Sequence, residues 1–137
     1  MLRPVMLKSG IFNPHVLDLV ARVRHTNTLV ISDWAFPFWP EIETVDISLT
    51  HGIPTVLDVL NVLAPNFQIG KIWQAEEFSK VNDSATVARF DTAFAAIEGA
   101  SVIKLPHIDF KKLVPGAIGL IRTGDATPYG NLILESA

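Results

Sequence analysis

AIGLIRTGDATPYGN, residues 117–131, is the segment that says most about the fold of this chain. Its first part, Ala117 to Ile121, is an apolar run that predicts a buried strand. The polar turn that follows presents the Tyr129 phenol and the Asn131 amide two residues apart. A turn that only reverses the chain needs Gly, Pro, Asn or Asp and has no use for a Tyr. Because α/β proteins place ligand chemistry on loops at the ends of buried strands, this turn is a candidate binding site.

Helices and strands alternate on both sides of this segment. Asn13 followed by Pro14 is a typical helix start, with Asn as N-cap and Pro at the first helical position. Apolar spacing predicts helices over 14–24, 55–63, 85–97 and 108–113, and strands over 28–32, 43–49, 69–73, 101–105, 117–122 and 132–134. Such alternation favours a layered α/β domain with a parallel or mixed central sheet.

Length and composition indicate one domain over residues 1–137, large enough for a real core. Hydrophobic residues make up 49% and charged residues 18% of the chain, whereas a small domain usually has roughly 25–35% charged residues on its surface. No apolar run is long enough to cross a membrane. We therefore expect the excess apolar surface to face other subunits in a homo-oligomer.

Charge and missing motifs exclude several functional classes. The net charge is −3 and there is no cysteine, which argues against nucleic-acid binding and excludes disulfides and thiolate metal sites. Residues 1–13 include Lys8 and lack a sustained apolar run, so no signal peptide is expected and a cytoplasmic location is the default. Signatures of nucleotide cofactors, zinc proteolysis and serine hydrolysis are also missing. We expect no metal and no cofactor.

Histidines and acids supply the remaining candidate chemistry. His15 and His51 are most simply surface residues, whereas His25 follows the end of the first predicted helix. There His25 either caps the helix C-terminus as a cation or serves as a general acid near neutral pH. Asp33 ends a strongly apolar strand, where a carboxylate either caps the next element or lines the usual ligand crevice. His107 reads most simply as a residue at a helix start.

The loop Trp34-Ala35-Phe36-Pro37-Phe38-Trp39-Pro40 gathers four aromatic rings. Such rings stack on sugar faces, but a loop this apolar is more often buried in a subunit interface, where aromatic residues are enriched. Both roles are compatible if a binding site lies between subunits.

The chain resembles the ribose pyranase / fucose mutarotase family, small enzymes that interconvert ring forms of free monosaccharides. The resemblance covers nearly the whole chain, and its most specific part is the Thr127–Asn131 segment. The other matching residues occur in the correct order and spacing: His25-Thr26, Ser32-Asp33, Phe36-Pro37, 46–49, 52–54, His107 and 122–124.

This resemblance implies a site and an architecture. His25 matches the family's catalytic histidine, the proposed proton donor, and the sugar-binding residues match Asp33, His107, Tyr129 and Asn131. The family's fold is a single three-layer α/β/α domain with a mixed, largely parallel sheet. The resemblance also implies toroidal oligomers, typically decamers, with the sugar site between adjacent subunits. The expected partners are a free monosaccharide and further copies of the chain, with no nucleic acid and no membrane.

The chain departs from the family pattern at Arg24 and Asn27, where Gly and Asp are usual, and at Trp34, where a small residue is usual. Features of the ribose and fucose branches are mixed, and His107 favours D-ribose as the sugar. The alternatives are an L-fucose mutarotase and a non-catalytic monosaccharide-binding protein associated with sugar transport.

Overall fold

A computed structural model describes residues 6–137. No signal peptide is expected in residues 1–13, and the first five of these residues lie outside the described part of the chain. The helices are α1 (Pro14–Ala21), α2 (Val56–Leu63), α3 (Glu77–Val81), α4 (Ser84–Ala95), α5 (His107–Leu113) and the short 3-10 helix η1 (Val114–Gly116). The strands are β1 (Thr28–Ser32), β2 (Glu43–Asp46), β3 (Ile69–Ala75), β4 (Ser101–Leu105), β5 (Gly119–Arg122) and β6 (Leu132–Ser136).

The six strands form one mixed sheet in the order β2-β5-β1-β6-β3-β4. β5 is parallel to both β1 and β2, and β3 is parallel to β4. β6 lies between β1 and β3 and runs antiparallel to both. The C-terminal ends of the other five strands and the N-terminal end of β6 therefore meet at one edge of the sheet.

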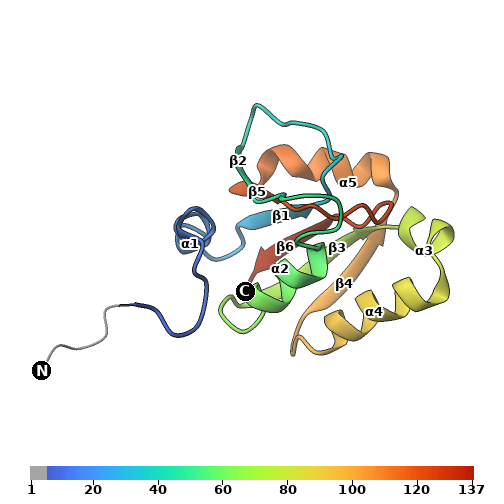
Figure 1. Cartoon of the computed structure of the whole chain (residues 1–137). Coiled ribbons are helices and arrows are strands. Elements are labelled where there is room, and N and C mark those ends of the chain that lie inside the picture. Colours follow the sequence, from blue (N-terminus) through green and yellow to red (C-terminus); the bar gives the residue numbers. More distant parts are fainter. Residues whose placement is uncertain (1–5) are drawn as a thin grey trace, which may run out of the picture.

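Helices cover both faces of the sheet, which confirms the predicted three-layer α/β/α domain (Figure 1). On one face, Leu19 of α1, Leu60 of α2 and Phe90 of α4 belong to the larger core cluster. On the other face, Phe110 of α5 is fully buried in a smaller cluster that contains Val30 of β1. Loss of a ring such as Phe110 would cost about 3–5 kcal/mol of stability, so α5 is firmly fixed to the sheet.

Side-chain caps set the beginnings of the longer helices. Asn13 Oδ1 accepts hydrogen bonds from the backbone N–H groups of His15 and Val16, as the Asn-Pro pair predicts. Thr55 and Asp58 form a reciprocal capping box at the start of α2. These caps fix the loops that precede α1 and α2.

The main differences from the prediction concern three elements. The helix predicted over 14–24 ends at Ala21. The strand predicted over 43–49 ends at Asp46, because Asp46 Oδ1 accepts hydrogen bonds from the backbone N–H and the hydroxyl of Ser48 and turns the chain. The five-residue helix α3 was not predicted, because it is too short to show a helical repeat of apolar residues.

No helix within residues 6–137 is long and apolar enough to cross a lipid bilayer.

Candidate functional site

Four of the five predicted site residues lie at the edge of the sheet where β1 and β5 end and β6 begins. Asp33 directly follows β1, Asn131 directly precedes β6, Tyr129 lies in the turn between β5 and β6, and His107 begins α5. We call this edge, with these four residues, the Asp33 edge. Residues 98 positions apart in sequence thus come within hydrogen-bond distance, as the contact between Asp33 and Asn131 shows.

Direct contacts join the four residues in two pairs. Asn131 Oδ1 accepts a hydrogen bond of 2.7 Å from the backbone N–H of Asp33. The His107 ring lies 5.0 Å from the Tyr129 ring, centroid to centroid, with the planes at 80°. Phe36 packs edge-on against the same imidazole at 6.4 Å. The Asp33 edge is therefore a preformed cluster of amide, carboxylate, imidazole and phenol groups.

The carboxylate of Glu77 fixes the start of α5. Its two oxygens accept hydrogen bonds of 3.0 and 3.1 Å from the backbone N–H of His107. Glu77 belongs to α3, the helix that the sequence did not predict, so this contact was also missed. It ties the position of the His107 ring to the end of β3, two residues before Glu77.

Two polar atoms at the Asp33 edge are buried without a hydrogen-bond partner among residues 6–137: Asp33 Oδ1 and His107 Nδ1. Leaving a buried polar atom unpaired typically costs about 1–3 kcal/mol, and the great majority of such atoms in proteins are paired. The free carboxylate oxygen of Asp33 can accept a hydrogen bond, and the free imidazole nitrogen of His107 lies beside the Tyr129 phenol. Hydroxyl groups of a polyol ligand can hydrogen-bond to both atoms.

Burial also changes the protonation of both groups. Burial raises the pKa of the Asp33 carboxyl, and the charge of Asp125 adds to this effect. The backbone amides of Phe36 and Ala35 and the Arg122 guanidinium act in the opposite direction. Burial lowers the pKa of His107, with a further contribution from Lys111 against an opposing one from Glu77. His107 is therefore a neutral imidazole near pH 7, able to donate from one nitrogen and accept at the other.

His25 lies at the opposite end of β1 from Asp33. Its neighbour Thr26 donates a backbone hydrogen bond of 3.2 Å to Ser136, the last residue of β6, whereas Asn131 precedes the first residue of that strand. At about 3.3 Å per residue, the five residues of β1 alone separate the two ends by roughly 13 Å. A single chain does not bring His25 to the other four residues.

The surroundings of His25 are open. The exposed imidazole lines a hollow of about 660 Å³ together with Phe67, Ser136 and Ala137. We call this region the His25 edge. No residue in it buries the imidazole, which leaves its ring available to a ligand or a neighbouring molecule.

Two side chains fix the backbone of the turn that carries His25. The side chain of Asn27 accepts a hydrogen bond of 2.8 Å from the backbone N–H of Arg24, and the Ser136 hydroxyl donates to the Arg24 carbonyl. Thr26 has a φ of +66°, which is unfavourable for a β-branched residue. Asn27, the departure from the family's Asp, therefore fixes the turn rather than contacting the imidazole.

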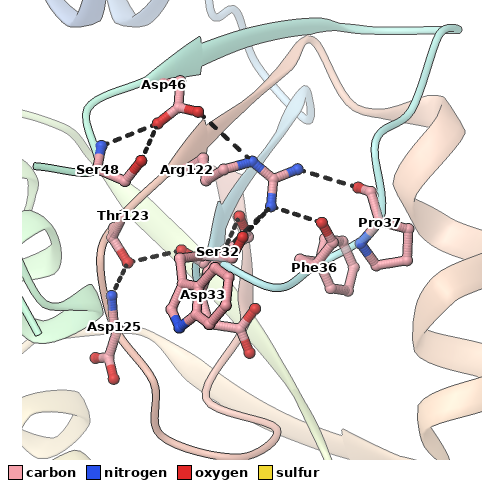
Figure 2. A network of polar contacts seen from close by, with 10 residues as sticks. Ser32, Asp33, Phe36, Pro37, Asp46, Ser48, Arg122, Thr123 and Asp125 are labelled. Atoms are coloured by element: carbon pink, nitrogen blue, oxygen red, sulfur yellow. Dashed lines mark hydrogen bonds and ion pairs between the residues drawn. The ribbon is translucent and has the colours of Figure 1, made fainter. Parts of the chain in front are cut away.

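Arg122 is a functional candidate that the sequence analysis did not single out. Its guanidinium donates to the carbonyl oxygens of Asp33, Trp34, Phe36 and Pro37 at 2.6–3.4 Å (Figure 2). Its side chain is almost entirely buried at the end of β5. The sequence signal was an arginine that ends an apolar strand immediately before a polar turn.

Asp125 and Gly124 shape the turn after β5. Asp125 Oδ2 accepts a hydrogen bond of 2.9 Å from the backbone N–H of Val56 at the start of α2, so Asp125 is a structural turn residue. A Cβ on Gly124 would lie 2.3 Å from the carbonyl oxygens of Thr50 and Ile53. Only glycine allows the backbone to approach this closely.

The aromatic loop is divided between the core and the surface. Phe36 is buried and Trp39 half-buried in the cluster beneath α5. The side chains of Trp34 and Phe38 are 54% and 73% exposed, so only these two rings are free to meet a ligand or another subunit.

His15 and His51 are exposed, in agreement with the surface positions expected for them. Among residues 6–137, no group of three or more His, Asp or Glu side chains is arranged to hold a metal ion.

Comparisons with known proteins agree with this architecture. The chain is 36% identical over 131 residues to a D-ribose pyranase of Laribacter hongkongensis, with 96% of this chain and 97% of the relative covered. It is 38% identical over 131 residues to a D-ribose pyranase of Geobacillus kaustophilus, with 96% and 93% covered. Its fold matches the structure of Bacillus subtilis RbsD complexed with D-ribose, with a TM-score of 0.86, 32% identity, and 96% and 98% of the two chains covered.

A sequence profile of the RbsD / FucU transport protein family matches residues 6–137. This match spans all of the described strands and helices and every predicted site residue. The chain therefore belongs to the RbsD / FucU transport protein family.

Proposed function

We propose that this protein is a cofactor-independent isomerase that interconverts the ring forms of a free monosaccharide, with D-ribose as the preferred sugar. The observation that carries the proposal is the pair of buried, unpartnered polar atoms, Asp33 Oδ1 and His107 Nδ1, beside the Tyr129 ring. The D-ribose pyranases that it resembles, at 36% and 38% identity, supply the substrate class.

The proposed reaction opens and recloses the sugar ring. A base removes the proton of the anomeric hydroxyl, the bond between C1 and the ring oxygen breaks, and an acid protonates that oxygen. The product is the open-chain aldehyde. Rotation and attack on C1 by a different hydroxyl, with the proton transfers reversed, gives another ring form. All of the steps are proton transfers to or from oxygen, which suit an imidazole near neutral pH.

His25 is the proposed acid and base, because its exposed ring is free to exchange protons with solvent. At the Asp33 edge, the Asp33 carboxylate accepts from a sugar hydroxyl, and the neutral His107 ring supplies a donor or an acceptor. The Tyr129 hydroxyl contacts the sugar from the adjacent turn. The Asn131 oxygen already accepts from Asp33, so Asn131 contributes its amide NH₂ group to the ligand and its oxygen to the position of Asp33.

A homo-oligomer completes this site in our proposal. Within one chain, β1 separates His25 from the other four residues, so a second copy must place its His25 edge against the Asp33 edge of the first. Such a contact is heterologous and closes into a ring when the rotation between copies is a whole fraction of a turn. Exposed apolar side chains provide surface for these contacts, including Phe12, Phe38, Leu49 and Ile108 at 63–78% exposure.

The test is saturation-transfer NMR on equilibrated D-ribose and L-fucose. The wild-type protein should accelerate exchange between ribose ring forms, and His25→Ala should reduce that acceleration by about 100- to 10,000-fold, the usual contribution of one general acid or base. The matched control is His15→Ala, which removes an exposed imidazole near the start of α1 and should leave exchange unchanged.

The outcomes separate the alternatives. Ribose binding without accelerated exchange would support a non-catalytic binding protein, and faster exchange of L-fucose than of D-ribose would support the mutarotase alternative. Wild-type exchange rates in His25→Ala would contradict the assignment of the acid.

A further inference from the structure

We propose that Arg122 is a positioning residue that sets the orientation of the Asp33 carboxylate for the sugar by gathering the carbonyl groups of residues 33–37. This inference rests on the proposed function, because it assigns the support for one of the proposed sugar contacts. Arg122 itself does not touch the sugar in this proposal.

The contacts of Arg122 are unusual for a buried arginine. Its side chain is 11% exposed, and the nearest carboxylate oxygen, Asp46 Oδ2, lies 4.0 Å from Nε. Its closest contacts are instead the carbonyl oxygens of Phe36 at 2.6 Å and Trp34 at 3.1 Å (Figure 2). A guanidinium presents donors in a rigid planar fork, which fits several carbonyl groups that converge from one loop.

These carbonyl groups belong to the segment that carries Asp33. On its N–H side, the segment is fixed by two hydrogen bonds, from Asp33 to Asn131 Oδ1 at 2.7 Å and from Trp34 to the Asp125 carbonyl at 3.0 Å. On its carbonyl side, Arg122 donates to the Asp33 and Trp34 carbonyl oxygens, which belong to the peptide unit whose N–H is on Trp34 and to the next one, and also to the carbonyl oxygens of the following turn. Because both sides are held, the Cα–Cβ direction of Asp33 is determined by its backbone.

Electrostatics supports the same role. Asp125 and Arg122 are the charged groups that act on Asp33, with opposite signs, and burial is the largest influence. Burial raises the pKa of the Asp33 carboxyl, whereas the Arg122 cation lowers it. The cation therefore favours the ionised form that accepts hydrogen bonds from sugar hydroxyls.

A purely structural role for Arg122 makes a different prediction. If the guanidinium only stabilised the fold, its replacement would lower thermal stability but leave the sugar affinity of the folded protein unchanged. A positioning role instead raises KM more than it lowers the rate at saturating sugar, because His25 and the chemistry are untouched. It also moves the pH dependence of sugar binding.

The experiment compares Arg122→Lys and Arg122→Met with the wild-type protein. Arg122→Lys keeps the charge but loses the fork, and Arg122→Met loses both. Arg89→Met is the matched control, since Arg89 is an exposed arginine on α4 whose guanidinium hydrogen-bonds to Thr86 of its own helix. D-ribose affinity, KM and the saturated exchange rate are measured from pH 4 to pH 8 on protein that retains its wild-type circular dichroism and oligomeric state.

Arg122→Met should weaken D-ribose binding by about 10- to 100-fold, because a misoriented Asp33 carboxylate loses its charge-assisted hydrogen bonds to the sugar hydroxyls. The acid-side loss of binding should move to higher pH in Arg122→Met, because the cation that lowers the pKa of Asp33 is gone. Arg122→Lys should also show a KM above that of the wild-type protein, but its pH profile should be displaced less than that of Arg122→Met. Because Arg122→Lys keeps a cation at this position, it also serves as the test if Arg122→Met does not fold.

Unchanged KM and an unchanged pH profile in folded Arg122→Lys or Arg122→Met would overturn this inference while leaving the proposed function intact. Absence of both ribose binding and ribose exchange in the wild-type protein would instead overturn the proposed function, and the inference with it.

Discussion

The two ends of β1 differ in how they are built. At the Asp33 edge, Asn131 is buried and the other three residues are half-buried, and the side chains of Asn131, Arg122 and Glu77 hydrogen-bond to the backbone there. At the His25 edge, the imidazole is exposed over a wide hollow, and only the backbone of its turn is fixed. The difference indicates that the two edges have different roles. The Asp33 edge is rigid enough to select a ligand, and the His25 edge is open to a second protein surface.

Backbone strain marks both edges. Among residues 6–137, Thr26 and Tyr129 are the non-glycine residues with positive φ, at +66° and +56°. One directly follows His25 and the other is itself a proposed sugar contact. Strained backbone conformations cost about 1–3 kcal/mol and tend to occur at functional sites, so their positions agree with the assignment of both edges to one function.

Mixing two inactive variants gives the largest expected effect and tests whether the edges act across copies. His25→Ala and His107→Ala should each have little exchange activity alone. In oligomers assembled from equal amounts of both, about a quarter of the sites should combine an intact His25 edge with an intact Asp33 edge, if each site lies between two copies. Ribose exchange of the mixed, reassembled protein measures the recovery.

The control is a mixture of two other single variants, His107→Ala and Tyr129→Phe. Both changes lie at the Asp33 edge, so no mixed site has all of its groups and activity should not recover. Mixed His25→Ala and His107→Ala oligomers that stay as inactive as either variant would show that the two edges do not meet between copies.

A pair of glycine substitutions tests the difference in rigidity. Gly124→Ala places a Cβ 2.3 Å from two backbone oxygens at the Asp33 edge. Relief of this clash requires the backbone to move, so we expect a loss of about 1–3 kcal/mol in the free energy of unfolding. Gly70→Ala, at the His25 edge, meets the Cβ of Ala137 at 3.1 Å. This approach is much less severe than the one at Gly124, and the expected change is below about 1 kcal/mol.

Denaturant unfolding at one fixed protein concentration measures both variants, since the stability of an oligomer depends on concentration. Gly116→Ala, where a Cβ would meet nothing within 4 Å, is the control. Equal losses for Gly124→Ala and Gly70→Ala would contradict the contrast between a rigid and an open edge.

The smallest expected effect concerns the charge of Asp33. Because burial raises its pKa above the ordinary value of 3.8, the folded protein holds this proton more tightly than the unfolded chain. The stability that protonated Asp33 contributes is fully present below pH 3.8 and is lost as the pH rises through the folded pKa. Asp33→Asn removes this loss, so its free energy of unfolding relative to wild type should increase between pH 3.8 and neutrality.

Unfolding curves at several pH values measure this difference. The opposite contribution of His107, whose pKa is lowered, is common to both proteins and cancels in the comparison. A constant offset between the two proteins across this pH range would contradict the effect assigned to burial of Asp33.

Periodicity and turn chemistry predicted most of the fold. The β-branched run at 28–32 and the Asn-Pro helix start gave β1 and α1, because each signal is local in sequence. The candidate site residues were also identified from the sequence and the resemblance. Their grouping is a tertiary property, however: Asp33 meets Asn131 only because antiparallel β6 begins where parallel β1 ends.

The residues that were missed act through the backbone. Arg122 binds carbonyl groups and Glu77 binds an N–H group, and the sequence does not show which backbone groups such side chains will meet. The sequence analysis assigned the whole aromatic loop, residues 34–40, to a subunit interface. In the structure, Phe36 fills the core, whereas Trp34 is exposed. That distinction depends on the direction in which each side chain leaves a loop, which sequence spacing does not determine.

The position of β6 has a consequence for how the protein is made. Strands β2, β5 and β1 form one half of the sheet and β3 and β4 the other, and β6 is the strand that joins them. On the ribosome, the two halves cannot unite until residues 132–136 have been synthesised. The nascent chain therefore exposes the hydrogen-bonding edges of β1 and β3 that face β6 until β6 has been made. Mutations that weaken β6 are expected to increase aggregation during synthesis more than they alter the finished protein.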